Sequence, residues 1–398
     1  MASNRGALVA MGLYHAANDG TVVAIPALFP LLLEENVLTN FTQVGILLAI
    51  ALGVTVVLQI FFGAMSDRGS TRLLLPAGMV IVGVASLFTA LAQTFAVLLL
   101  FVAIGRIGAS VYHPVGISWV GRMFKRDLDR AMGFQSALGD LGVIVAFASS
   151  GFLGLVFGWQ VPLLIWGGFA LVAALVGYLL TRQVAPEPAP RGGPKTPPWT
   201  QILRRVTLWI VPLAIGGAAY IITIGFGNSL LIQRLGLTGD TANFVIALWI
   251  AAGVVAAYNY GRISAAFGRF RSLLVAYFIV GVAALVLSLT PPLALLIPTF
   301  LLFGVGLFIT YPALFAFISE STEDVIGGTT FGIVFGLQLV GGAIAGYAAG
   351  VMADAFGIHT PFLLLTGLGF AGFLILWTAT PAHLRNRRSG RDTSRTGG

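Results

Sequence analysis

The sequence predicts an all-α polytopic membrane protein, with twelve transmembrane helices arranged as two parallel six-helix repeats. The composition is the first observation, because 58% of the 398 residues are hydrophobic and only 9% are charged. A soluble protein carries about a quarter charged residues, so a water-soluble enzyme is excluded. The other two observations are twelve long apolar stretches and a recurrence of glycines and prolines about 198 residues apart. The chain has no cysteine, which excludes disulfides and thiolate metal sites.

Each apolar stretch is long enough to cross a bilayer, which needs about 20 mostly apolar residues. The predicted spans are 8–33, 41–65, 73–92, 95–120, 131–156, 160–181, 206–232, 241–265, 272–290, 293–318, 328–352 and 360–380. The first stretch is too long for the apolar core of a signal peptide and contains polar side chains, so we predict that it is retained.

Basic residues predict the orientation of the spans. Of the 22 lysines and arginines, Arg106 falls inside a span, Arg234 lies on one side, and the rest lie on the side that holds both termini. The positive-inside rule therefore places both termini in the cytoplasm. Arginine far outnumbers lysine, which is typical of a GC-rich prokaryotic genome. We therefore expect the protein in the cytoplasmic (inner) membrane of a prokaryote. The bases are spread over six segments, which argues against a nucleic-acid-binding face.

A polar, proline-rich stretch at 183–200 separates six spans from six spans. The predicted units are an N-terminal half at 1–182, a cytoplasmic linker at 183–204, a C-terminal half at 205–380 and a basic cytoplasmic tail at 381–398. A shift of 198 residues superposes Pro114 on Pro312, and a shift of 199 superposes Gly142 on Gly341. Because six is even, both copies enter the membrane in the same direction and the repeat is parallel.

The segment between the second and third predicted spans reads G-A-M-S-D-R-G-S-T-R. With the two six-helix halves, it resembles the cytoplasmic signature G-x-x-x-D-R-x-G-R-R of the major facilitator superfamily. The resemblance implies a conformational latch that closes and breaks as the halves rock. The latch residues that it assigns are Gly63, Asp67, Arg68 and Arg72. The second copy keeps Gly261 and Arg269, but Ala265 replaces the acid.

Two further motifs are H-A-A-N-D, which begins at His15, and G-R-I-G-A-S-V-Y-H-P, which begins at Gly105. Together they resemble the fosmidomycin resistance branch of that superfamily. This resemblance implies proton-coupled efflux of drugs, the namesake substrate being a small phosphonate.

Three full charges lie well within predicted spans: Asp19, Arg106 and Asp140. Each would cost at least about 2.5 kcal/mol facing lipid at a helix centre, so we expect them to face a shared aqueous cavity. Asp19 either carries a proton through alternating contact with Arg106 or forms a static pair with it. The proton-coupling candidates are Asp19, Asp140, His15 and His113. His113 either titrates or satisfies a carbonyl that Pro114 leaves free.

Arg106 is the main candidate for binding substrate, because guanidinium offers planar paired donors to phosphonate or carboxylate oxygens. Its alternative role is structural pairing with Asp19 or Asp140. The other predicted substrate-binding side chains are polar residues within spans: Asn18, Ser110, Tyr112, Tyr220, Thr223, Asn228, Tyr311 and Gln338. The ionisable groups cluster in the first half, so we predict ionic coupling there and neutral recognition in the second half.

The predicted function is proton-coupled secondary transport by alternating access, as an antiporter that exports small anionic or drug-like molecules such as phosphonates. One alternative is a proton symporter that imports an organic acid or a phosphorylated metabolite. A second is a receptor or scaffold that does not transport. We expect a monomer in the lipid bilayer that binds a small-molecule substrate. We expect no nucleic-acid partner, no catalytic or metal site and no cofactor besides the coupling proton.

Overall fold

The computed structural model describes residues 2–67, 73–124, 127–184, 199–321 and 328–385. Within these ranges every regular element is an α-helix. The N-terminal half contains α1 (Ala2–Ala27), α2 (Phe29–Glu34), α3 (Phe41–Asp67), α4 (Leu74–Thr89), α5 (Phe95–Ala109), α6 (Tyr112–Met123), α7 (Leu128–Phe157) and α8 (Gln160–Thr181). The C-terminal half contains α9 (Trp199–Leu235), α10 (Gly239–Tyr258), α11 (Tyr260–Phe267), α12 (Arg269–Ser288), α13 (Leu293–Ser321), α14 (Gly328–Phe356), α15 (Thr360–Ala379) and α16 (Ala382–Arg385).

The fourth predicted span is broken into α5 and α6 at Ser110 and Val111. Pro114 has no N–H group, so the Ser110 carbonyl lacks its usual helical donor, and the helix restarts at Tyr112. The break matters for function because it places His113 in the first turn of a new helix.

The described chain has the predicted twelve-helix, two-repeat architecture. Ten helical segments are long and apolar enough to cross a membrane, with α5 and α6 counted together as Phe95–Met123. The third predicted span is the shorter apolar helix α4, and the first is α1, a 26-residue helix that carries the polar residues of the first motif. The protein is therefore a multi-pass membrane protein.

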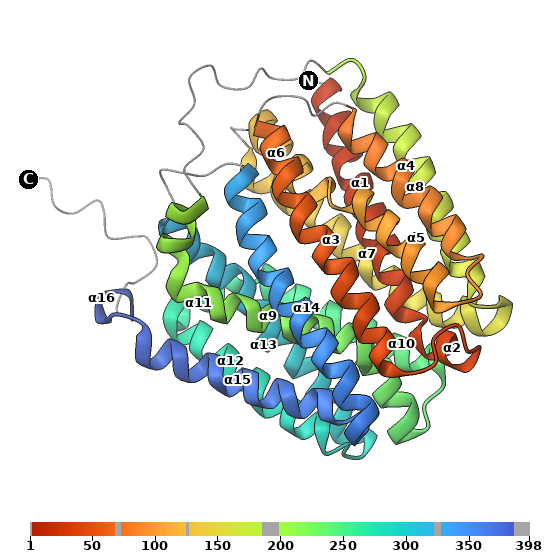
Figure 1. The fold of residues 1–398 in the computed structure, drawn as a ribbon. Helices are drawn as coiled ribbons and strands as arrows, with labels where there is room; N and C mark the ends of the chain where they lie inside the picture. Colours follow the sequence, from red (N-terminus) through yellow and green to blue (C-terminus); the bar gives the residue numbers. More distant parts are fainter. Residues whose placement is uncertain (1, 68–72, 125–126, 185–198, 322–327, 386–398) are drawn as a thin grey trace, which may run out of the picture.

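The two halves lie side by side, with the N-terminal half in red to yellow and the C-terminal half in green to blue (Figure 1). They meet where α3 packs on α14 and where α7 packs on α10. Within the halves, α1 packs on α7 as α9 packs on α14. A Cβ on Gly142 would lie 2.4 Å from the Ala16 carbonyl oxygen, and one on Gly341 would lie 2.1 Å from that of Ala214. The internal repeat is therefore visible in matched backbone contacts.

Hydrogen bonds join the halves at one end of the bundle, which we call the distal face and define by the turns at 35–40, 236–238 and 357–359. The Asp354 carboxylate on α14 accepts from the backbone N–H groups of Phe41 and Thr42, at 2.9 and 2.7 Å. It also accepts from the Thr42 hydroxyl at 2.6 Å. These N–H groups begin α3 and have no partner within the helix, so Asp354 caps α3 from the other half.

The end of α1 is held at the same face. The Asn228 Nδ2 group donates to the carbonyl oxygens of Pro26 and Ala27, at 3.2 and 3.4 Å. The Asn243 Nδ2 group donates to the Ala27 carbonyl oxygen at 3.0 Å. Every hydrogen bond between the halves whose two partners are both described lies at the distal face. Among the described residues, these hydrogen bonds join the halves at the distal face, and we call them the distal seal.

Candidate functional site

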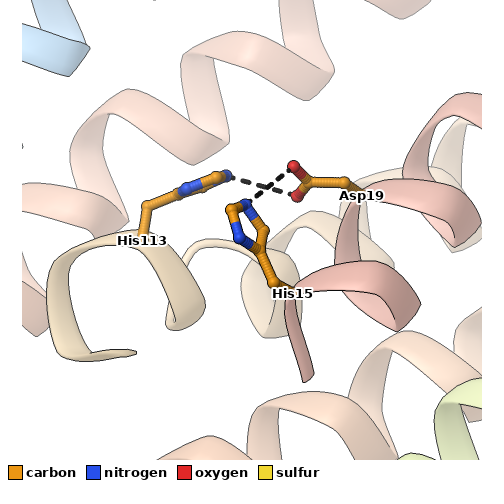
Figure 2. Close-up of side chains that lie close together, drawn as sticks. All are labelled: His15, Asp19 and His113. Atoms are coloured by element: carbon orange, nitrogen blue, oxygen red, sulfur yellow. Dashed lines mark ion pairs between the residues drawn. The ribbon is translucent and has the colours of Figure 1, made fainter. Parts of the chain in front are cut away.

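Three ionisable side chains meet where α1 passes α6, and we call them the His–Asp–His triad (Figure 2). His15 and Asp19 lie one helical turn apart on α1, with 3.1 Å between His15 Nε2 and Asp19 Oδ2. His113 Nε2 lies 3.4 Å from Asp19 Oδ1. Asn18 Nδ2 donates to the same oxygen at 2.8 Å. Both oxygens of Asp19 therefore have nitrogen atoms within 3.4 Å, while its side chain keeps 21% of its surface exposed.

The hydrogen bonds of His15 define where its protons lie. Its Nδ1 atom is 2.8 Å from the Gln135 backbone carbonyl oxygen, which can only accept, so Nδ1 carries a hydrogen. The Nε2 atom then faces Asp19 either with a second hydrogen, as imidazolium, or with a lone pair against a carboxylate. The second arrangement is repulsive. The contact between His15 and Asp19 is therefore built to hold a proton.

Tyr112 supports the His15 ring from α6. The two rings stack with centroids 4.5 Å apart. Tyr112 is fully buried, and the single hydrogen of its hydroxyl has two acceptors within reach, the Met11 carbonyl oxygen at 2.9 Å and Gln135 Oε1 at 2.7 Å. Tyr112 was predicted to bind substrate, but its hydroxyl is occupied by protein groups. We therefore assign it a supporting role.

Gly139 on α7 provides the space that the His15 ring occupies. A Cβ at this position would lie 2.6 Å from three atoms of the ring, which no real Cβ tolerates. Asp140 follows it, and is half-buried and interacts electrostatically with His15 and Asp19. The small residues of this segment serve the close packing of α7 on α1, and Asp140 lies beside the triad without a hydrogen bond to any described residue.

Gly139→Ala is expected to reduce proton-coupled transport at least tenfold, because the new methyl group must push the His15 ring away from Asp19. The measurement is pH-gradient-driven flux in proteoliposomes. Gly133→Ala on the same helix is the matched control, since a Cβ there has no atom within 4 Å. Equal losses in the two variants, or none in Gly139→Ala, would refute the role of this glycine.

Arg106 lies in the last turn of α5 and is half-buried. Its guanidinium makes no hydrogen bond or ion pair with any described residue, but it interacts electrostatically with Asp19 and Tyr220. Direct pairing of Arg106 with Asp19 or Asp140, one of the sequence-based alternatives, is absent from this conformation. At Asp19 the carboxylate is contacted instead by the two histidines and Asn18. Arg106 also lines a small pocket of about 30 Å³ between α1, α4 and α5.

The Tyr220 hydroxyl on α9, in the C-terminal half, lies near the charged residues of the N-terminal half. It lies near enough to three groups of the N-terminal half for their charges to affect its ionisation: Asp19, Asp140 and Arg106. Tyr311 on α13 and Gln338 on α14 are also half-buried, and the Tyr311 hydroxyl donates to the Gly216 carbonyl oxygen at 3.2 Å. The structure thus brings the intramembrane charges together and sets neutral side chains opposite them.

Three other predicted substrate-binding residues lie elsewhere. Ser110 and Thr223 are fully buried and donate to carbonyls of their own helices, those of Arg106 and Ala219. Asn228 is fully buried in the distal seal. In an apolar span, a polar side chain that faces a cavity and one that hydrogen-bonds to the backbone give the same sequence pattern. The sequence therefore could not distinguish these two cases.

Only part of the predicted latch can be located. Gly63 is buried within α3. Arg68, Arg72 and the Asp67 side chain lie outside the described residues. In the second copy of the motif, Arg269 forms an ion pair with Glu320 at the end of α13.

The triad also offers three atoms that could ligate a metal, within 4.8 Å of one another. No metal site was expected from the sequence, because no set of ligands recurs at helical spacing along a single helix, whereas this cluster is assembled from α1 and α6. The three side chains also contact one another directly, and His15 contacts the Gln135 carbonyl oxygen.

Comparison with known proteins decides the family. The family model of the Major Facilitator Superfamily matches residues 9–343. The chain belongs to the major facilitator superfamily. This confirms the superfamily and the fold predicted from sequence, and it places the chain among transporters, a superfamily whose members are in general not enzymes.

Two bacterial relatives of this major facilitator protein align over nearly the whole chain. The uncharacterized MFS-type transporter YfnC of Bacillus subtilis is 26% identical, over 96% of this chain and 95% of the relative. The fosmidomycin resistance protein of Escherichia coli is 27% identical, over 95% of this chain and 94% of the relative.

Solved structures share the fold of this major facilitator protein. A mutant of the nucleoside transporter NupG superposes with a TM-score of 0.78 at 12% identity, over 95% of this chain and 100% of that one. A bacterial homologue of the human lysosomal transporter Spinster, in an inward-facing and unoccupied conformation, superposes with a TM-score of 0.73 at 19% identity, over 95% of both chains.

Proposed function

We propose that this protein is a proton-coupled transporter of small anionic molecules. The observation that carries the proposal is that the His–Asp–His triad lies near Arg106, whose guanidinium has no hydrogen-bond or ion-pair partner among the described residues. The triad binds the coupling proton between His15 and Asp19, and Arg106 binds the anion. Because Arg106 and Asp19 interact electrostatically, the occupancy of one site affects the other.

The conformation fits one step of alternating access. With the termini in the cytoplasm, as the positive-inside rule predicts, the sealed distal face is the outer face. The side chains of the triad and Arg106 would then receive substrate from the cytoplasm. Rocking of the halves breaks the distal hydrogen bonds and exposes the same side chains to the other side.

Export in exchange for protons is the first candidate for direction, and the relative that confers fosmidomycin resistance supports it. Exchange requires substrate and proton to exclude each other. A substrate with both an anion and a hydrogen-bond donor does this, since the anion binds Arg106 while the donor replaces the proton at Asp19.

Co-transport with protons is the second candidate, and the charges of the site favour it for a substrate that is only an anion. A negative charge on Arg106 makes a second negative charge on Asp19 less favourable. Anion and proton would then bind together.

The sign of a pH effect separates the two directions, whatever the orientation of the protein. Proteoliposomes would hold equal labelled aminomethylphosphonate inside and outside, with the voltage clamped and a chelator present, before the outside is acidified. Exchange drives the label out of the vesicles, and co-transport drives it in.

The controls test both binding sites. Arg106→Ala is expected to reduce the flux to that of protein-free liposomes, whereas Arg234→Ala, at an exposed distal arginine, is expected to leave it unchanged. A flux that Arg106→Ala abolishes but that does not change with the pH gradient would refute proton coupling. A flux that Arg106→Ala leaves intact would refute the anion site.

A further inference from the structure

An aromatic cluster lies in the C-terminal half opposite the charges, and we call Tyr220, Trp249, Phe308 and Tyr311 the aromatic wall. The Tyr220 ring lies 5.9 Å from Trp249 and 6.3 Å from Phe308, between centroids. Phe308 lies 5.7 Å from Trp249 and 5.8 Å from Tyr311. Trp249 is fully buried behind the others, whereas Tyr220 and Tyr311 are partly exposed.

Tyr220 joins the aromatic wall to the anion site. Its ring packs in the cluster, and its hydroxyl lies near enough to Arg106, across the boundary between the halves, for the Arg106 charge to affect its ionisation. A ligand whose anion binds Arg106 therefore extends its remaining atoms toward aromatic faces.

The repeat shows that this contrast is built into equivalent positions. A shift of 198 residues places Gly304 at the position of Arg106. A Cβ on Gly304 would lie 3.0 Å from Trp249 Cδ1 and 2.3 Å from the Trp249 carbonyl oxygen. The Trp249 backbone, and less tightly its indole, thus occupy the space that a side chain at this position would need. The N-terminal half has the guanidinium of Arg106 at this position, whereas in the C-terminal half the equivalent Gly304 packs against Trp249.

The triad positions are also neutral in the second half. The same shift places Leu213, Gly217 and Tyr311 at the positions of His15, Asp19 and His113. At these three positions the C-terminal half therefore provides no competing charge, and a ligand there meets ring faces and a few hydrogen-bonding groups.

We infer that the substrate is an anion attached to a flat aromatic ring, with the anion on Arg106 and the ring against the aromatic wall. This deepens the proposed function and rests on it. Ring pairs interact by offset or edge-to-face contacts that a saturated ring of similar size does not form. The inference therefore distinguishes an aromatic substrate from one that is merely apolar.

Three phosphonates test the inference by isothermal calorimetry on the purified full chain. Phenylphosphonate is expected to bind at least tenfold more tightly than methylphosphonate and at least threefold more tightly than cyclohexylphosphonate. Phe308→Leu and Tyr220→Leu are each expected to reduce the phenyl-over-cyclohexyl preference to within twofold. Phe303→Leu is the matched control, because Phe303 stacks on Trp249 but is fully buried, and it should keep the preference.

Each failure has its own signature. Equal binding of phenylphosphonate and methylphosphonate, both lost in Arg106→Ala, overturns the aromatic substrate and leaves the proposed anion site standing. Equal binding of the phenyl and cyclohexyl compounds, or a preference that survives both wall variants, also overturns it. Binding of all three compounds unchanged in Arg106→Ala overturns the anion site and the inference together.

Discussion

Asp19→Asn is expected to abolish pH-gradient-driven transport while leaving anion binding within a few-fold of the wild-type protein. The amide is nearly the same size as the carboxylate, but it cannot carry the coupling proton or form an ion pair with the imidazolium of His15. Arg106, which makes no direct contact with Asp19, remains in place. The measurement pairs gradient-driven flux in proteoliposomes with exchange of labelled anion at equal pH, which should persist.

Asp140→Asn is the matched control for this prediction. Asp140 is the other intramembrane carboxylate of the site, but it makes no hydrogen bond to a described residue. We expect the gradient-driven flux of the Asp140→Asn variant to stay within a few-fold of the wild-type value. The reverse outcome, with Asp140→Asn inactive and Asp19→Asn active, would assign the coupling proton to Asp140.

Asp354→Ala is expected to open the distal face. The substitution removes three hydrogen bonds that cap α3 from the opposite half. Hydrogen bonds to charged groups contribute about 1.5–3 kcal/mol when well shielded, but Asp354 is exposed, so we expect a combined loss of about 1–2 kcal/mol. That loss raises the population open at the distal face by about five- to thirtyfold.

A single introduced cysteine reports this opening, because the natural chain contains none. Leu48 is 2% exposed, and its Cδ1 atom lies 2.8 Å from a Cβ position on Gly225 of the other half. Leu48→Cys should react with a membrane-impermeant maleimide faster when Asp354→Ala is also present. Asp240→Ala is the control, since this distal carboxylate bonds to Thr238 and Thr241 of its own half. A labelling rate unchanged by Asp354→Ala would contradict the prediction.

The fold could be predicted from sequence because a bilayer makes local composition decisive. Each span must satisfy its backbone internally and present an apolar surface, and both requirements are visible in a single stretch of sequence. The break at Pro114 was visible for the same local reason. The first span was recognised although its polar residues weaken the apolar signal.

The site could be predicted only in part. The sequence identified the ionisable residues on α1 and α6, but the partner of His113 depends on how two helices pack. It likewise could not show that Gly139 accommodates the His15 ring, since a glycine that admits a side chain resembles one that packs against a helix. The distal cap from Asp354 joins residues about 310 positions apart, and no local pattern reports such a contact.

The two asparagines of the distal seal bind main-chain oxygens at the end of α1. Substitutions that change the side chain of Ala27 leave its carbonyl in place, so this end of the helix can vary in sequence without loss of the closure. The constraint falls instead on Asn228 and Asn243. Among homologous transporters, we therefore expect Asn228 on α9 and Asn243 on α10 to vary less in sequence than the end of α1 that they hold.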